Sequence, residues 1–427
     1  MIDASTTPPH ARYLIVGSSH AGREALAAIR MHDPDGSLVM LTRDRYLPYS
    51  PTILPYVMSG RSDPARVALS SPAWFVQNNA ELIQGARVVA VDANARIVSL
   101  ADGKSWRYDK LLLATGAEPM LPGVDGLAAV KYHVLRTLDD AIALKARAQT
   151  ARRVVVLGAG LVGLHAAETL AEAGLDVTVV EMRPHVLAEY FDPRAASLIG
   201  AAFERHGVTM LMSRRAVRAE AEGADSCRLV LDDGTALPAD LLLVAAGVRP
   251  ELAMLADSGI ATDKGILVDE RMRTGADGIW AAGDVAQAHG FLSGSPIVNG
   301  TLPEAVEQGR IAGQDMAGDP DLNLYPGGVP LNTFGFFGHH AVAVGAATAA
   351  AGDGVEVKTT DGASPLGYCR IVLRDNRLIG FAAIDLVTDA GILWQLIRRR
   401  IDLTPVREQF LSHPLETARG LMSRVWR

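Results

Sequence analysis

Two stretches of the chain repeat the same order of apolar and small residues. Residues 13–17 and 153–158 are short apolar runs that end in glycine. Each leads into an Ala- and Leu-rich segment of helical period and then into a second apolar run, residues 37–44 and 175–181. Continuous apolar strands that alternate with helices are typical of a parallel sheet covered on both faces. The pattern therefore predicts two strand–turn–helix–strand units, about 140 residues apart, in an α/β fold.

Later segments extend this pattern. Leu111–Gly116, Leu241–Gly247 and Gly278–Asp284 are apolar runs that end in small residues, and residues 303–318 have a helical period. From about residue 326 the pattern changes to short strands followed by helical segments, without a glycine motif, which predicts a small α+β domain. Tyr325–Gly328 contains Pro and two Gly and marks the expected boundary.

Composition narrows the class of protein. The 427 residues are enough for two or three domains, and 49% hydrophobic with 21% charged residues is typical of a folded enzyme. The net charge of −7 argues against general nucleic-acid binding. The N-terminal segment resembles no signal peptide, and no apolar run approaches the roughly 18 residues of a membrane span, so we expect a cytoplasmic protein.

The cysteines and histidines argue against disulfide, thiol-redox, iron–sulfur and metal sites in this chain. Cys227 and Cys369 are the only cysteines, too few for a disulfide framework, a CxxC redox pair or a four-cysteine iron–sulfur site. The pair His339-His340 has no acid or thiol nearby at ligand spacing, so we predict no metal site.

The segment from Gly158 to Gly163 has the spacing of a dinucleotide-binding turn. Gly158 permits the tight turn, Gly160 lets the backbone approach a pyrophosphate, and Gly163 lets helix and strand pack closely. Leu161 and Val162 start the predicted helix, whose N-terminal N–H groups are free for the phosphates. We predict a dinucleotide site here; the alternative is a glycine-rich turn used only for packing.

Glu181 ends the next predicted strand, about 20 residues on, where such sites carry a ribose-binding acid. Its carboxylate can accept hydrogen bonds from the ribose diol, whereas a 2′-phosphate would bring like charges together. Arg183 could pair with such a phosphate and would then weaken the preference. The sequence thus favours NADH over NADPH.

A second, less complete turn lies near the N-terminus. Gly17-Ser18-Ser19-His20-Ala21-Gly22 keeps the first and third glycines and has Ser19 at the middle position, where its hydroxyl can donate to a phosphate. The following apolar run ends in Thr42-Arg43-Asp44, so the ribose-binding acid is either displaced or is Asp44. Two dinucleotide turns in one chain would allow electron transfer between two nucleotide cofactors.

Five motifs in order carry a family resemblance: GSSHAG (17–22), YDKLLLATGAEP (108–119), GAGLVG (158–163) with Glu181, LLLVAAGVRP (241–250) and GIWAAGDVAQ (278–287). Together they resemble the pyridine nucleotide-disulfide oxidoreductase superfamily, in particular its ferredoxin- and rubredoxin-reductase-like members, over residues 12–320. The resemblance implies an α/β fold with two Rossmann-like dinucleotide-binding domains and a small C-terminal α+β domain. It places FAD on the first turn and NAD(H) on the second.

The same resemblance implies domain limits and further cofactor contacts. The FAD-binding domain would comprise residues 1–122 and 242–325, the NAD-binding domain 123–241 and a C-terminal interface domain 326–427. The chain would cross between domains at Ala114-Thr115-Gly116 and Ala245-Ala246-Gly247. The remaining implied FAD contacts are Val88 with adenine, Gly283 and Asp284 with the ribityl chain and pyrophosphate, the helix that begins near Pro303 with the flavin pyrimidine edge, and Pro51 and Thr52 with the flavin face.

Two positions depart from the family pattern. In Ser50–Tyr56, Thr52 stands where disulfide reductases of the superfamily carry a redox cysteine, so thiol chemistry is disfavoured. Pro51 and Thr52 can equally serve turn geometry alone. His165 replaces a glutamate that usually lies near the nicotinamide. We favour a packing role for His165 over a cofactor contact.

The resemblance implies an FAD-containing NAD(H):acceptor oxidoreductase that needs no catalytic acid or base. Its whole-chain pattern is similar to NADH-linked flavoprotein subunits of 2-oxoacid dehydrogenase complexes, which implies an iron–sulfur, ferredoxin-like partner subunit and 2-oxoacid dehydrogenase subunits. Two alternatives stay open, a stand-alone NADH reductase or oxidase and a non-catalytic subunit that retains FAD. The C-terminal region carries seven arginines, which could bind an acidic partner or form a solvated helix face: Arg398, Arg399, Arg400, Arg407, Arg419, Arg424 and Arg427.

The role of Glu181 gives a direct prediction. At about 4 Å and an effective dielectric of 20, repulsion between its carboxylate and a 2′-phosphate is roughly 4 kcal/mol before screening. We therefore expect kcat/KM for NADH to exceed that for NADPH in steady-state assays. An equal or higher value with NADPH would contradict this role.

Overall fold

The computed structural model describes residues 7–362 and 364–425. The chain folds into two compact units, each formed by segments that are distant in sequence. Unit 1 combines the residues up to Ile53 with Ala65–Glu118 and Val248–Gly328. Unit 2 combines Leu54–Pro64, Pro119–Gly247 and the residues from Val329 onward.

Unit 1 is built on one large sheet with the strand order β3-β2-β1-β6-β5-β4, and β17 pairs with the second half of β6. Strands β3, β2, β1, β6 and β17 are parallel, whereas β4 and β5 form an antiparallel extension. The strands are β1 (His10–Val16), β2 (Leu38–Leu41), β3 (Ala80–Ile83), β4 (Val88–Asp92), β5 (Ile97–Leu100), β6 (Ser105–Leu113) and β17 (Ile279–Ala281). The α-helices of this unit are α1 (His20–His32), α3 (Pro72–Gln77) and α7 (Leu302–Ala317).

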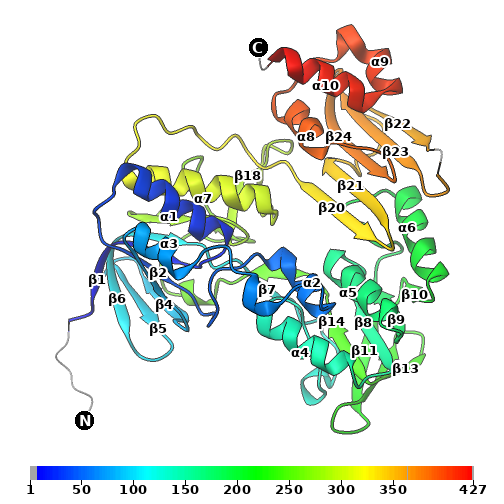
Figure 1. The fold of residues 1–427 in the computed structure, drawn as a ribbon, viewed down its shortest axis with the longest axis horizontal. Coiled ribbons are helices and arrows are strands. Elements are labelled where there is room, and N and C mark those ends of the chain that lie inside the picture. The colour runs from blue at the N-terminus through cyan, green and yellow to red at the C-terminus, as the bar shows by residue number, and fades with distance from the viewer. Residues whose placement is uncertain (1–6, 363, 426–427) are drawn as a thin grey trace. The chain divides into compact units, whose positions relative to one another are not determined.

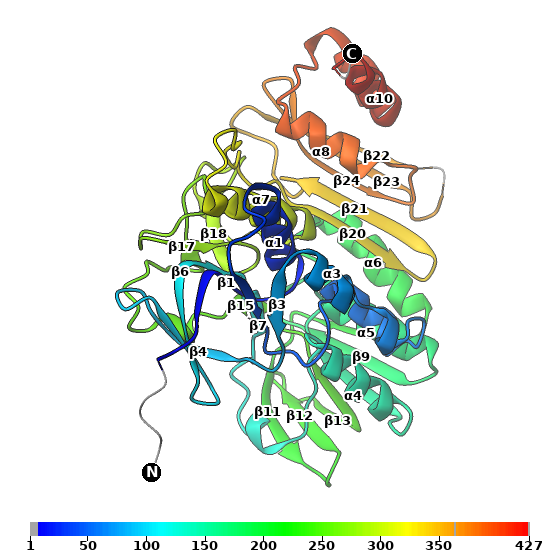
Figure 2. The same ribbon diagram turned by 60° about the vertical axis from the view of Figure 1, so that its left-hand side comes forward.

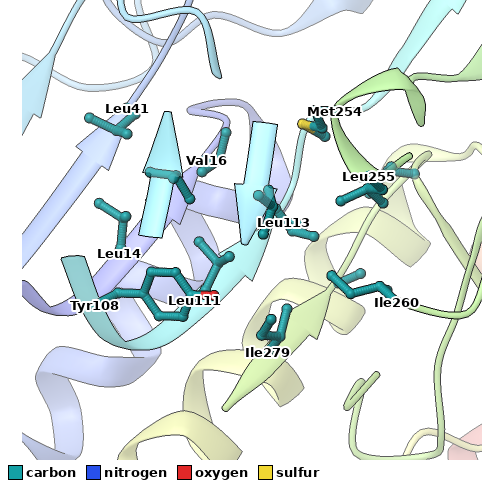
Figure 3. Packing of buried hydrophobic residues seen from close by; sticks show 14 of the residues in the cluster. Leu14, Val16, Leu41, Tyr108, Leu111, Leu113, Met254, Leu255, Ile260 and Ile279 are labelled. Carbon is teal, nitrogen blue, oxygen red and sulfur yellow. The ribbon is translucent and has the colours of Figure 1, made fainter. Parts of the chain in front are cut away.

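The apolar runs identified in the sequence form the centre of this sheet. β2 is buried along its whole length, and the last four residues of β1 are buried as well. Side chains of alternate residues, such as Leu14 and Val16 in β1 and Leu111 and Leu113 in β6, share one core cluster with Ile279 of β17 (Figure 3). Burial on both faces explains why these strands read as continuous rather than alternating apolar runs.

Short strands complete unit 1. They form a two-stranded ribbon, β7 (Ala117–Pro119) with β15 (Val248–Pro250), and a small sheet of β16 (Ile266–Leu267), β18 (Ala286–His289) and β19 (Pro296–Ile297). The ribbon joins the segments at which the chain leaves and re-enters this unit.

Helices α1 and α7 lie side by side in unit 1 (Figures 1 and 2). Two glycines of α7 make this close approach possible. A Cβ atom on Gly309 would lie 2.2 Å from the carbonyl oxygen of Ala21, and one on Gly313 would lie 2.4 Å from that of Ala25. Because real Cβ atoms do not approach backbone this closely, larger residues would push the two helices apart.

Unit 2 contains a second parallel sheet with the order β10-β9-β8-β14. Its elements are β8 (Arg153–Leu157), α5 (Leu161–Glu172), β9 (Asp176–Glu181), α6 (Pro193–Arg205), β10 (Thr209–Met212) and β14 (Leu241–Val244). The unit also contains α2 (Leu54–Met58), α4 (Leu138–Ala148) and an antiparallel sheet of β11 (Ala216–Ala221), β12 (Cys227–Leu231) and β13 (Ala236–Ala239).

The C-terminal part of unit 2 is a five-stranded antiparallel sheet with the order β20-β21-β24-β23-β22, followed by helices. Its strands are β20 (Leu331–Phe336), β21 (His339–Gly345), β22 (Val355–Asp361), β23 (Tyr368–Arg374) and β24 (Arg377–Ile384). The helices are α8 (Ala390–Arg398), α9 (Arg407–Ser412) and α10 (Pro414–Val425).

A mostly parallel sheet in unit 1, a parallel sheet in unit 2 and an antiparallel C-terminal sheet confirm the predicted fold class. The two strand–turn–helix–strand units are β1-α1-β2 and β8-α5-β9. The domain limits derived from the sequence, and the cofactor assigned to each domain, stay predictions.

The α1–α7 contact generates a stability prediction. Gly309→Ala should cost about 1–3 kcal/mol by overpacking, visible as a thermal unfolding midpoint several degrees lower. Gly420→Ala is the matched control, since this glycine of α10 has no atom within 4 Å of a built Cβ and alanine is the better helix former. A Gly309 variant as stable as the wild type would contradict the close contact.

Candidate functional site

The first glycine turn follows β1, the strand at which the order of strand addition in the unit 1 sheet reverses. β1 pairs with β2 on one side and with β6 on the other, so the turn lies at a topological switch point, where α/β proteins bind ligands. Gly17 has φ +111°, and a Cβ on it would lie 2.0 Å from the carbonyl oxygen of Ala114, just after β6. A Cβ on Gly22 would lie 2.0 Å from the carbonyl oxygen of Gly17. Both glycines are therefore required for packing.

The second turn repeats this geometry in unit 2. Gly158 has φ +112°, and its built Cβ would lie 2.3 Å from the carbonyl oxygen of Ala245, just after β14. A Cβ on Gly163 would lie 2.0 Å from the carbonyl oxygen of Gly158, the same distance as that from Gly22 to Gly17. By contrast, Gly160 has no atom within 4 Å of a built Cβ. Packing thus does not explain Gly160, whereas the predicted contact with a pyrophosphate would.

Helices α1, α5 and α7, like the short helix α9, begin without a side-chain cap. The N-cap residues of α1, α5 and α7 are Ser19, Gly160 and Thr301, and none of them accepts a hydrogen bond from its helix through its side chain. Helices α4, α6 and α8, in contrast, are capped by the side chains of a Thr or an Asp. Open N-terminal N–H groups favour an anionic ligand. The uncapped set contains both helices that follow the glycine turns.

Glu181 is held beside the second turn. Its carboxylate accepts hydrogen bonds from the N–H of Ala159 at 2.7 Å and from the N–H of Arg183 at 2.8 Å. The guanidinium of Arg183 donates to Glu189 at 2.8 Å. The carboxylate is therefore oriented at the end of β9, next to the turn, as a ribose-binding acid requires.

Around the first turn, the structure gathers polar atoms that have no protein partner. Thr115 Oγ1, Asn299 Nδ2 and Thr301 Oγ1 are among the side-chain atoms of the described residues that are buried without a hydrogen-bond partner. Thr115 follows β6, and Asn299 and Thr301 precede α7. Such groups are costly unless a ligand satisfies them, so the site fits a polar cofactor such as FAD. The sequence analysis missed Asn299 and Thr301, because nothing in the local pattern shows that they are buried.

Residues predicted to contact the adenosine part of FAD lie near the carboxyl end of β2. Arg43 forms an ion pair with Glu118, and the Asp44 carboxylate accepts a hydrogen bond from Tyr49 OH at 3.0 Å. Val88 starts β4, two residues after Ala86, whose N–H donates to the Thr42 carbonyl at 2.8 Å. The structure thus brings Val88 close to this strand end.

The segment expected at the flavin face contains hydroxyls and an imidazole. His20 is hydrogen-bonded to Ser50 Oγ at 2.9 Å, and Ser50 Oγ is 2.7 Å from Thr52 Oγ1. Burial lowers the pKa of His20. Cys227 and Cys369 are buried in β12 and β23, and burial raises the pKa of both thiols, to about 11 for Cys369.

All predicted cofactor residues fall into two groups. Unit 1 contains Gly17, Ser18, Ser19, Gly22, Arg43, Asp44, Pro51, Thr52, Val88, Ala114, Thr115, Gly116, Gly283, Asp284 and Pro303. Unit 2 contains Gly158, Gly160, Leu161, Val162, Gly163, Glu181 and Gly247. The assignment of these residues to FAD and NAD(H) stays a prediction.

His165 and Glu168 of α5 both face the C-terminal sheet within unit 2. The His165 ring meets the ring of Phe334 edge-on, with centroids 4.8 Å apart. Glu168 accepts a hydrogen bond from the N–H of Phe337 at 2.5 Å, and burial raises the pKa of its carboxyl. These contacts favour the packing role for His165.

Within residues 7–362 and 364–425, no group of three or more His, Cys, Asp and Glu side chains is arranged to hold a metal ion. No helix in the described part of the chain has the length and apolar character needed to cross a bilayer.

The family profile of the pyridine nucleotide-disulphide oxidoreductases matches residues 11–309, and the chain belongs to this family. The predicted superfamily is thereby confirmed. Family membership makes the protein an oxidoreductase and, together with its NADH-dependent flavoprotein relatives, supports FAD and NAD(H) as its cofactors.

Three known proteins show the extent of its sequence and structural similarity within this family. The chain is 48% identical over 419 residues to the NADH-dependent phenylglyoxylate dehydrogenase subunit epsilon of Aromatoleum evansii, covering 98% of this chain and 99% of the relative. It is 30% identical to the rubredoxin-NAD(+) reductase of Pseudomonas putida, over 71% and 80% of the two chains. The crystal structure of the ferredoxin reductase for the CYP199A2 system from Rhodopseudomonas palustris superposes with a TM-score of 0.83 at 29% identity, over 92% and 96%.

Because the space next to Gly160 is open, a substitution there should affect NADH binding without affecting stability. Gly160→Ala should raise KM for NADH about tenfold, equivalent to about 1.4 kcal/mol, because the methyl group occupies the pyrophosphate position. Its thermal unfolding midpoint should match that of the wild type. Gly163→Ala should instead lower the midpoint, because its Cβ would overlap the Gly158 carbonyl. Steady-state rates at varied NADH concentration, with thermal unfolding in parallel, check both; an unchanged KM in Gly160→Ala would place the pyrophosphate elsewhere.

Proposed function

We propose that the protein is the NAD(H)-linked flavoprotein subunit of a phenylglyoxylate or related 2-oxoacid dehydrogenase complex, which forms an acyl-CoA. In this role it exchanges hydride with NAD(H) and single electrons with an iron–sulfur partner. The observation that carries the proposal is the 48% identity to the phenylglyoxylate dehydrogenase epsilon subunit over nearly the whole of both chains. We assign FAD to the turn of unit 1 and NAD(H) to the turn of unit 2.

Each assigned residue has a binding or orienting task. The N–H groups at the start of α1 and α5 bind the two pyrophosphates, and the hydroxyls of Thr115 and Thr301 donate to the flavin cofactor. Glu181 accepts hydrogen bonds from the ribose of NAD(H) and so orients the nicotinamide nucleotide. When bound, FAD supplies the conversion between two-electron hydride chemistry and one-electron chemistry.

The cysteine inventory supports a separate iron–sulfur chain. Only two cysteines occur in the sequence, and both are buried in strands with raised pKa values. A buried neutral thiol is a poor nucleophile and a poor ligand. A thiol relay within this chain is therefore disfavoured, and a cluster must come from a partner.

A stand-alone NADH:ferredoxin or rubredoxin reductase, or an NADH oxidase, is the alternative, and the rubredoxin-NAD(+) reductase similarity supports it. The two proposals differ in their electron acceptors. The subunit proposal requires copurifying iron–sulfur and 2-oxoacid dehydrogenase chains, whereas a stand-alone enzyme turns over with a small redox protein or oxygen.

The deciding experiment is native purification followed by identification of bound chains and an anaerobic reaction with NADH. We expect bound FAD that NADH bleaches, copurifying iron–sulfur chains, and NAD+ reduction driven by phenylglyoxylate and coenzyme A. Rapid NADH oxidation by oxygen with no bound chains would favour the alternative. Flavin that NADH does not bleach would exclude both and leave a non-catalytic subunit.

We further propose that the arginines at the end of α8 bind the acidic partner. The guanidinium carbon of Arg398 lies 4.4 Å from the centroid of the Trp394 ring. Arg377, at the start of β24, donates a hydrogen bond to the Arg400 carbonyl at 3.0 Å. Strand pairing sets Arg374 opposite Arg377. The fold thus places two hairpin arginines beside Arg398, Arg399 and Arg400, which belong to the seven C-terminal arginines named from the sequence. Arg427 lies outside the described residues.

Reversal of charge tests this surface. Changing Arg398, Arg399 and Arg400 to Glu should slow electron exchange with the iron–sulfur partner at least tenfold at low salt, because electrostatic attraction mainly raises association rates. NADH reduction of FAD should be unaffected. Arg205→Glu, at the exposed end of α6, reverses one charge away from this surface and should leave partner kinetics unchanged; unchanged partner kinetics in the triple variant would leave only a solvated helix face.

A further inference from the structure

The loop that follows β9 in unit 2 carries an ion pair that the functions assigned above do not use. This loop comprises residues 182–192, between the end of β9 and the start of α6. The guanidinium of Arg183 donates a hydrogen bond to the Glu189 carboxylate at 2.8 Å. Glu181, which we assign to the ribose of NAD(H), is two positions before Arg183. A cation at this place bears on which nucleotide the site accepts.

The backbone of Arg183 is held against the Glu181 carboxylate. The N–H of Arg183 donates to Glu181 Oε1 at 2.8 Å, and the N–H of Ala159, in the glycine turn, donates to Oε2 of the same carboxylate at 2.7 Å. The carbonyl of Arg183 accepts a hydrogen bond from the N–H of Ser213 at 3.0 Å. Arginine binds phosphate groups through paired hydrogen bonds. The direction of the Arg183 side chain therefore decides whether such a bond is available at the ribose 2′ position.

Glu189 is placed by a loop whose backbone is fixed. Leu187 has φ +49°, a conformation that is uncommon for residues other than glycine and that persists where the surroundings impose it. Its N–H donates to the carbonyl of Ala159 at 2.9 Å. Its carbonyl accepts hydrogen bonds from the N–H groups of Tyr190 at 2.8 Å and Phe191 at 3.1 Å, and the side chains of Leu187 and Phe191 are buried. The loop thus returns to the glycine turn and presents Glu189 to Arg183.

The ion pair itself lies on the surface. The side chains of Arg183 and Glu189 are 51% and 62% exposed. Such a pair contributes little to folding stability. It can nevertheless control the guanidinium, because Glu189 belongs to the same loop and competes with a free phosphate at a high effective concentration. Its effect is therefore expected in nucleotide selection and not in stability.

A second arginine at this end of the sheet is also turned to an acid. Arg214 follows β10, which pairs with β9, and its N–H donates to the carbonyl of Glu181 at 2.9 Å. The guanidinium of Arg214 forms an ion pair with Asp233 at 2.7 Å. Arg183 and Arg214 thus both have their backbone at Glu181 and their side chains on other carboxylates. This arrangement is the reverse of what a 2′-phosphate requires.

We propose that Glu189 is a second specificity-determining residue of the nucleotide site, which holds Arg183 away from the ribose 2′ position and so disfavours nucleotides with a 2′-phosphate. Glu181 repels such a phosphate directly. Glu189 acts through Arg183, by occupying the cation that would otherwise bind the phosphate, and is therefore a positioning residue. This inference rests on the proposed NAD(H) site in unit 2 and adds to it the arrangement that selects against NADP(H).

The test is calorimetric titration of the FAD-containing protein with adenosine 2′,5′-bisphosphate, which carries the 2′-phosphate, and with 5′-AMP, which carries the free ribose diol. Glu189→Gln removes the charge and keeps the size of the side chain. It should bind the bisphosphate about fivefold more tightly than the wild type, the gain expected from one exposed ion pair, and should bind 5′-AMP as the wild type does. In steady-state assays, kcat/KM for NADPH should rise by a similar factor, with kcat for NADH unchanged.

Further variants show whether this gain passes through Arg183. Arg183→Ala alone should leave the affinity for the bisphosphate unchanged, because Glu189 already occupies the guanidinium; combined with Glu189→Gln, it should abolish the gain. Glu356→Gln is the matched control for charge, since it removes an exposed carboxylate paired with Arg407 at the edge of the C-terminal sheet, and should change neither affinity.

Three results would overturn the inference: no gain in Glu189→Gln, a gain that persists without Arg183, or an equal gain in Glu356→Gln. Weaker bisphosphate binding in Arg183→Ala alone would do so as well, because Arg183 would then already bind the phosphate. Failure of the proposed function is a separate outcome. Binding of 5′-AMP and NADH by the wild type tests the nucleotide site, and the difference between Glu189→Gln and the wild type tests Glu189.

Discussion

Both glycine turns depend on the contact of a glycine backbone with the carbonyl group that follows a neighbouring strand. Gly17 meets Ala114 and Gly158 meets Ala245 at distances that leave no room for a side chain. This contact brings the first helix turn to the carboxyl edge of each sheet, where its N–H groups stay open to a ligand. The conformational freedom of glycine in the unfolded chain opposes folding, and the protein accepts that cost twice.

The sequence was sufficient to predict the features that are set by local spacing. Apolar runs that end in glycine predicted both parallel sheets, and the interval from Gly158 to Glu181 predicted a carboxylate beside the second turn. Each of these signals lies within about 25 residues, because a strand, a turn and a helix are consecutive. The family motifs then extended the prediction to both cofactors.

What the sequence could not predict depends on contacts between distant residues. Glu304 lies in the first turn of α7, where an acid is common on exposed surfaces, yet its side chain is buried in the folded chain. The orientation of Arg183 toward Glu189, the packing of His165 on Phe334 and the grouping of Arg374 and Arg377 with the α8 arginines also require the folded chain. No local pattern reports such contacts.

The C-terminal sheet is joined to the helix of the second turn by more than apolar packing. Glu168 of α5 is buried and bonded to the backbone of Phe337, while Phe203 of α6 contacts the rings of Phe334, Phe336 and Phe337. Exchange of this sheet for that of another flavoprotein, by recombination or by design, would leave the Glu168 carboxyl and the Phe203 ring without their contacts in the C-terminal sheet. The nucleotide-binding part and the C-terminal sheet of unit 2 are therefore expected to be inherited together, with changes in one matched by changes in the other.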